Sequence, residues 1–243
     1  LAGLGIALVA VNWTVGGWEY ITFAAGEIKN PKRNLPLALI IGTITVLTLY
    51  FLVNIAYLKV LPMDSLVGEI KVGEMTARSL YGPGIGGVFA LVIIVSMFGA
   101  LNGNILVGSR VYYAMAKDRL FFSKAADVHP KFNTPGNAII IQGLWSAILT
   151  LSGTFEELIT LVVFVNFMLW IASSSTVFVL RKKQPGLDRP YKVWGYPYVP
   201  AFFILFSSVI MVNTFFESPE QSLMGLGLTV LGIPAYWYWK KRG

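Results

Sequence analysis

Long apolar runs separated by short polar stretches dominate the chain. Most runs reach or exceed the roughly 20 residues that an α-helix needs to cross a bilayer. The ten-residue segments of alternating polarity that are typical of membrane β-barrels do not occur. The pattern therefore predicts seven transmembrane helices, over residues 4–27, 35–61, 84–116, 136–153, 157–180, 197–216 and 222–239.

The composition supports a membrane protein. Of 243 residues, 56% are hydrophobic, 13% are charged and none is cysteine. An ordinary soluble domain carries about 25% charged residues, roughly twice this fraction. The sequence therefore disfavours a soluble globule, a disordered segment and a disulfide-stapled secreted domain.

Basic residues are concentrated in alternate loops. Of the 19 Lys and Arg residues, 16 lie in four segments, 28–34, 110–135, 181–196 and 240–242. Loops rich in Lys and Arg stay on the cytoplasmic side of a membrane. We therefore predict that the loops 28–34, 117–135 and 181–196 and the C-terminus are cytoplasmic and that the chain starts outside. The net charge of +7 then reflects topology, and no nucleic-acid partner is expected.

The stretch between the second and third spans is too polar for a crossing. Residues 62–83 contain acidic and basic side chains together with Gly82 and Pro83. We predict a short extracellular helix here, over residues 72–81, which could act as a lid.

The first span is interrupted at Gly16-Gly17. Each glycine lowers helix stability by about 1 kcal/mol relative to alanine. A helix opened near the bilayer midplane exposes N–H and C=O groups that lipid cannot satisfy. Broken helices of this kind hold ions and small zwitterions in secondary transporters. The alternative is that the glycine pair only allows close helix packing.

Two side chains beside the break are candidates for function. Glu19 lies within the span, where an acidic side chain costs roughly 2.5–3.5 kcal/mol, so we expect it to face a polar interior. It is a candidate for a proton-linked role, and the alternative is a structural carboxylate bonded to an indole or hydroxyl. Trp13 could cover a site as an aromatic lid, or simply pack.

Other candidate chemistry is sparse. The single histidine, His129, has no cysteine or second histidine to share a metal with. The pair Glu156-Glu157 fits a topological and solubility role better than a catalytic dyad. We expect no cofactor, no metal and no enzymatic activity.

Four segments in order, residues 13–36, 109–118, 129–138 and 189–197, resemble the amino acid–polyamine–organocation superfamily of permeases. The resemblance is to the L-type transporter and bacterial exchanger branches. It implies an all-α integral membrane fold, with the seven spans similar to helices six to twelve of a twelve-helix, five-plus-five inverted-repeat transporter. Residues 1–181 would be the second inverted repeat with its broken first helix, and 182–243 a cytoplasmic loop and two peripheral helices.

The resemblance implies secondary active transport of amino acids by alternating access, by exchange or proton coupling. It implies a multi-pass protein of the plasma membrane, such as a bacterial inner membrane. The partners would be the amino-acid substrate, the lipid bilayer and an N-terminal half of the same transporter that precedes this segment. The alternative left open is a non-transporting membrane scaffold or receptor-like relative.

The resemblance also assigns site residues. Trp13 matches the gating aromatic, and Thr14, Val15, Gly16 and Gly17 match the unwound stretch whose carbonyls receive the substrate ammonium. Glu19 matches a position implicated in proton sensing, and Phe167 matches an aromatic that lines the pocket. Further pocket-lining candidates are Tyr20, Ser96, Gly99 and Asn102. The chain departs from the family at Asp118-Arg119-Leu120-Phe121-Phe122, where the usual loop reads Asp-Gly-Leu-Pro.

Overall fold

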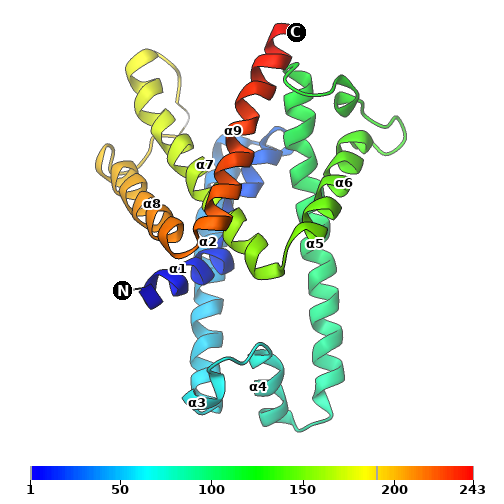
Figure 1. Ribbon diagram of the computed structural model, residues 1–243, viewed down its shortest axis with the longest axis vertical. Helices are drawn as coiled ribbons and strands as arrows, with labels where there is room; N and C mark the ends of the chain where they lie inside the picture. The colour runs from blue at the N-terminus through cyan, green and yellow to red at the C-terminus, as the bar shows by residue number, and fades with distance from the viewer. Residues whose placement is uncertain (1, 190, 243) are drawn as a thin grey trace. The chain divides into compact units, whose positions relative to one another are not determined.

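A computed structural model describes residues 2–189 and 191–242. These residues form α-helices and two 3₁₀ helices, η1 and η2, and contain no strand (Figure 1). In chain order the elements are α1 (Ala2–Val15), η1 (Trp18–Glu27), α2 (Pro31–Val60), α3 (Met63–Leu66), α4 (Val72–Tyr81), α5 (Ile85–Lys117), η2 (Ser123–Ala126), α6 (Gly136–Ser152), α7 (Phe155–Lys183), α8 (Tyr198–Glu217) and α9 (Pro219–Arg242).

Each predicted span is helical, but the spans are not equivalent. Within the described residues, α2, α5, α7 and α8 are the four helices that are long and apolar enough to cross a membrane. Helix α6 is apolar but has only 17 residues, and α9 has 24 residues with Pro234 inside it. The first predicted span is divided between α1 and η1. By length and composition, therefore, four of the seven predicted crossings are confirmed as long apolar helices within the described residues, and the other three stay predictions.

The polar stretch between α2 and α5 folds as predicted. Helix α4 covers Val72–Tyr81, and the one-turn helix α3 precedes it. Figure 1 shows both short helices at the same end of α2. The Arg78 guanidinium binds the Glu74 carboxylate one turn away, with Nη2 and Oε1 2.7 Å apart. This pair stabilises α4 by a few tenths of a kcal/mol.

The chain divides into two compact units. One contains residues 1–17 and 109–243, and the other contains residues 18–108. One division falls directly after Gly17, and the second falls inside α5, between Gly108 and Ser109. The predicted boundary near residue 181 concerns repeats rather than packing, and it stays a prediction.

The core of the larger unit is built on α7. Helices α8, α9 and α1 pack against it, and Val163, Phe167 and Ile210 form a buried cluster there. A second cluster of small side chains, Ala116, Ala125 and Ala138, joins the end of α5 to η2 and α6. Small residues let these backbones approach closely.

Helix α7 begins with a capping box. The backbone N–H of Thr154 donates to Glu157 Oε2 at 2.7 Å, and the Thr154 hydroxyl accepts from the Glu157 N–H at 3.4 Å. Each of these contacts satisfies an N–H that the first helical turn leaves without a helical partner. Glu157 therefore has a structural role in starting α7, beyond the topological one that the sequence suggested.

Helix α2, unlike the core built on α7, is exposed within the chain. Its most apolar window has no buried residue, and Ile41, Ile44 and Phe51 are at least 60% exposed within the chain. An apolar helix surface of this extent would be unfavourable in water, so it fits contact with lipid tails.

Candidate functional site

The predicted break in the first span is confirmed. Helix α1 ends at Val15, and the Gly16 N–H closes its last turn by donating to the Asn12 carbonyl at 2.7 Å. Gly17 then adopts φ = +92°, a conformation that side-chain-bearing residues rarely take. A Cβ at Gly16 would lie 3.0 Å from the Asn12 oxygen. The two glycines thus end the helix for different reasons: space at Gly16 and backbone freedom at Gly17.

The segment after the break differs from the expectation. A second α-helical half was expected, but residues Trp18–Glu27 form the 3₁₀ helix η1. The β-branched residues Ile21 and Thr22 and the glycine at 26 favour an α-helix weakly. The Thr22 hydroxyl also donates to the Glu19 carbonyl at 2.6 Å, three residues back. The chain is therefore wound more tightly here than in the other spans.

The end of α1 has the chemistry to hold a cation. The last carbonyls of an α-helix have no partners within it, and the helix dipole places partial negative charge at this end. Thr14 turns its hydroxyl back onto the Ala10 carbonyl at 2.9 Å. Trp13, two residues before the end of α1 at Val15, is 44% exposed, so its indole is available to cover this helix end.

Glu19 and Tyr20 lie in the first turn of η1, in the smaller unit. Both side chains are half-buried, and the Glu19 Oε2 atom is fully buried. The Tyr20 ring stacks on Phe23 with centroids 5.9 Å apart. Helix α2 packs against η1 within this unit. A partly buried carboxylate at the start of a helix benefits from the positive end of the helix dipole.

Phe167 is 2% exposed and belongs to the core of the larger unit. It contacts Val163 and Ile210, and its ring meets Trp170 edge to face at 5.4 Å. Leu8 of α1 packs against the same cluster, so this part of α7 lies beside α1. The role of Phe167 as a pocket-lining residue stays a prediction.

Three predicted pocket residues, Ser96, Gly99 and Asn102, are exposed on α5. Their spacing of three residues places them along one side of that helix. They belong to the same unit as Glu19 and Tyr20. Their part in a substrate site stays a prediction.

Metal ligands do not gather among the described residues: no three His, Cys, Asp or Glu side chains there form a group that could hold a metal ion. His129 instead closes a turn. Its Nδ1 accepts from the backbone N–H groups of Lys131 and Phe132 at 3.2 and 3.3 Å.

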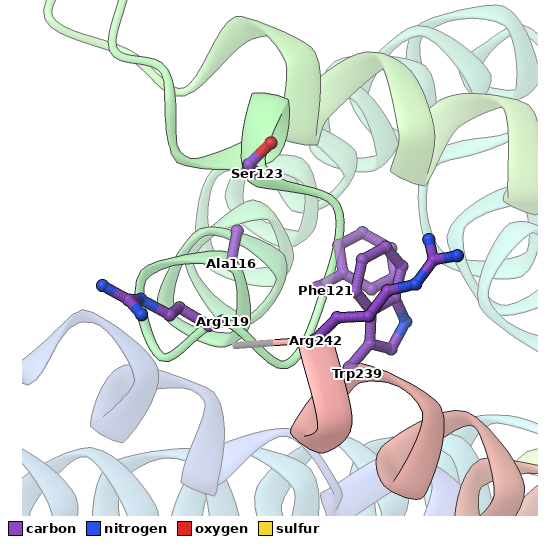
Figure 2. A pocket seen from close by; sticks show the side chains of 6 residues that line it. All are labelled: Ala116, Arg119, Phe121, Ser123, Trp239 and Arg242. Atoms are coloured by element: carbon purple, nitrogen blue, oxygen red, sulfur yellow. The ribbon is translucent and has the colours of Figure 1, made fainter.

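The sequence interpretation passed over one feature of the larger unit. A cavity of about 370 Å³ lies where α5 and α9 end (Figure 2). Its lining residues are Ala116, Arg119, Phe121, Ser123, Trp239 and Arg242. The only sequence signal for this cavity was at Arg119, where the loop departs from the usual family sequence. Trp239 and Arg242 lie about 120 residues further along the chain, so the sequence does not link them to that loop.

Comparison with known proteins supports the resemblance. A sequence model of the amino acid permease family matches residues 2–233. The serine/threonine exchanger SteT of Bacillus subtilis (strain 168) is 32% identical over 98% of this chain and 55% of its own length. The large neutral amino acids transporter small subunit 2 of Mus musculus and the human cystine/glutamate transporter are each 26% identical, over 45% and 48% of their lengths.

These relatives are transporters, and the chain spans about half the length of each. Together with the four long apolar helices, they establish a multi-pass membrane protein. The chain belongs to the amino acid permease family.

Proposed function

We propose that this chain forms half of a secondary transporter that moves amino acids across the membrane by alternating access, through exchange or proton coupling. The observation that carries the proposal is the break between α1 and η1, where Gly17 takes φ = +92° inside an apolar segment. A family relationship to amino-acid exchangers and transporters supports the substrate class.

The substrate would bind through its ammonium group at the end of α1. The carbonyls of Thr14, Val15 and Gly16 lie at the negative end of that helix, and a cation there is favoured by about 0.3–1 kcal/mol or more when partly buried. Trp13 would close over the bound substrate as the gating aromatic.

Glu19 is the proposed proton-linked residue. It is one of the few ionisable side chains within an apolar segment, and such residues mark proton and ion pathways in membrane proteins. Its buried Oε2 atom supports a position shielded from bulk water. Protonation of Glu19 would then change the charge of the segment that follows the break.

The remaining assignments complete the proposal. The protein would act in the plasma membrane, such as a bacterial inner membrane, with its C-terminus cytoplasmic, and it would catalyse no chemical reaction. The substrate carboxylate would be bound by the N-terminal half of the transporter, together with which this segment would form the complete site. Residues 1–181 would be one inverted repeat.

Isotope flux in proteoliposomes tests the proposal directly, using the complete transporter that contains this segment. We expect a labelled amino acid to be taken up. Uptake should rise when unlabelled amino acid is loaded on the opposite side of the membrane, or when a proton gradient is imposed across it. Absence of flux across a broad panel of amino acids would contradict it. If amino acids nevertheless raised the melting temperature, the protein would be a receptor-like relative that binds without transporting.

A further inference from the structure

The turn formed by residues 129–134 lies between η2 and α6, and His129 closes it. The backbone N–H of His129 donates to the Thr134 carbonyl at 2.8 Å, and its carbonyl accepts from the Asn133 N–H at 2.9 Å. Asn133 adopts φ = +51°, the left-handed conformation that asparagine tolerates in turns. Backbone hydrogen bonds therefore hold the two ends of the turn together.

The His129 side chain binds the middle of the same turn. Its Nδ1 atom accepts from the Lys131 N–H at 3.2 Å and from the Phe132 N–H at 3.3 Å. Pro130 has no N–H, so the N–H groups of the next three residues are all bonded to His129. The imidazole also stacks on the Phe132 ring, with the centroids 4.8 Å apart. The side chain thus holds the middle of the turn, while the backbone of the same residue holds its ends.

The two bonds to Nδ1 require a neutral imidazole. A neutral ring carries one proton, and an Nδ1 atom that accepts hydrogen bonds leaves that proton on Nε2. An imidazolium has a proton on each nitrogen, so its Nδ1 would meet the two backbone N–H groups as a third donor. Histidine is the side chain whose charge ordinarily changes between about pH 5 and 8. A proton on His129 therefore removes both bonds from the middle of the turn.

The other charged side chains near the turn are Lys124, Asp127 and Lys131, because α6 contains no charged residue. The Lys131 Nζ atom lies 5.4 Å from the centre of the Phe132 ring, the ring on which the imidazole stacks. Asn137 Nδ2 donates to Asp127 Oδ2 at 3.5 Å and to the Lys124 carbonyl at 2.9 Å. An amide does not titrate, so the bond from Asn137 to the Lys124 carbonyl joins α6 to η2 whether or not His129 is charged. The change on protonation is thereby confined to the turn.

We propose that His129 is a proton-operated switch: the neutral imidazole holds the 129–134 turn closed, and the imidazolium opens it. The turn leads into α6 at Ala138, which is buried together with Ala116 and Ala125 where α5, η2 and α6 meet. The connection between α5 and α6 is therefore ordered at neutral pH and loosened in acid. The switch depends only on the described contacts of the turn, so it is independent of amino-acid transport.

Hydrogen exchange of the complete transporter in detergent, at about pH 7.5 and about pH 5.5, tests the switch. Each amide's rate is corrected for the direct effect of pH on exchange. We expect the protection of the Lys131 and Phe132 amides to fall by about fivefold in acid, the loss of about one hydrogen bond. Nitrogen NMR of the histidine-labelled protein, with the His129 signals assigned by their loss in His129→Asn, reports when the ring gains its second proton. Protonation and the loss of protection should follow the same pH curve.

The matched variant is His129→Asn. An asparagine side-chain oxygen accepts from the backbone N–H two residues on, as in an Asx turn, and it does not titrate. This variant should keep the turn closed at both pH values, whereas His129→Ala should leave it open at both. Equal protection of the unmodified protein at the two pH values, or an imidazole that stays neutral at the lower one, would overturn the proposal. An equal loss in His129→Asn would overturn it in favour of another titrating group, such as Asp127.

Discussion

Two helix ends in this protein solve the same backbone problem with different residues. Helix α1 ends at Val15 and is followed by Gly17 with φ = +92°, whereas α5 ends at Lys117 and is followed by Arg119 with φ = +59°. At Gly17 there is no side chain, so the chemistry available is that of the backbone itself. At Arg119 the backbone conformation is less favourable, and the chemistry gained is a guanidinium. The comparison shows that the same left-handed conformation can be met by a residue without a side chain, as at Gly17, or by a residue that carries a cationic one, as at Arg119.

The strongest test of the α1 end is Gly17→Ala. A Cβ at φ = +92° is strained by about 1–3 kcal/mol, so the chain should rotate out of the broken geometry and amino-acid flux should fall by at least tenfold. Flux in proteoliposomes with equal protein incorporation measures this. Gly42→Ala in α2 is the control, because nothing lies within 4 Å of its Cβ position. Equal flux in both variants would show that transport does not depend on the broken geometry at Gly17.

Trp13→Ala tests whether the α1 end is covered by an aromatic side chain. We expect up to about a tenfold loss of turnover, the scale of one specific aromatic contact of 0.5–1.5 kcal/mol, with little change in melting temperature. Trp145→Ala is a matched control, since both indoles are 44% exposed. If the two variants lost turnover equally, Trp13 would be one of several packing aromatics rather than a gate.

Glu19→Gln tests the proton-linked role beside the break. An amide cannot take up a proton, so the uptake rate should change less with pH than in the unmodified protein. The part of the pH dependence that is lost should be the part that a single titrating group contributes. Uptake at several pH values with a fixed membrane potential measures this. Glu27→Gln, an exposed carboxylate at the other end of η1, should keep the original pH dependence. A full pH dependence in Glu19→Gln would leave Glu19 a structural carboxylate.

The smallest effect is expected at the α5 end. Arg119→Gly removes left-handed strain but adds freedom to the unfolded chain, so the net gain should be about 0.5–1 kcal/mol. Thermal unfolding in detergent without added lipid measures it. Asn133→Gly, at φ = +51°, should gain less, because asparagine tolerates this conformation. A lower melting temperature for Arg119→Gly would show that the side chain stabilises the fold itself.

Local signals in the sequence were reliable where one residue type decides the structure. The glycine pair located the break, and the polar stretch at 62–83 gave α4 with its observed bounds, Val72–Tyr81. The Thr154-x-x-Glu157 spacing was a visible capping-box pattern, although the sequence interpretation assigned Glu157 only a topological role. The 3₁₀ winding of η1 was not foreseen, because apolar periodicity does not distinguish closely related helix types over ten residues.

Hydrophobic patterning was enough to determine the helical class and the position of each apolar segment, because these depend on burial in lipid residue by residue; the sidedness inferred from charge stays a prediction. Only the tertiary structure decided that Phe167 lies in a core with Val163 and Ile210, and that Arg119 and Arg242 line one cavity. Those contacts join positions tens to more than a hundred residues apart. They depend on how helices pack, and the periodicity of a single segment carries no information about its distant neighbours.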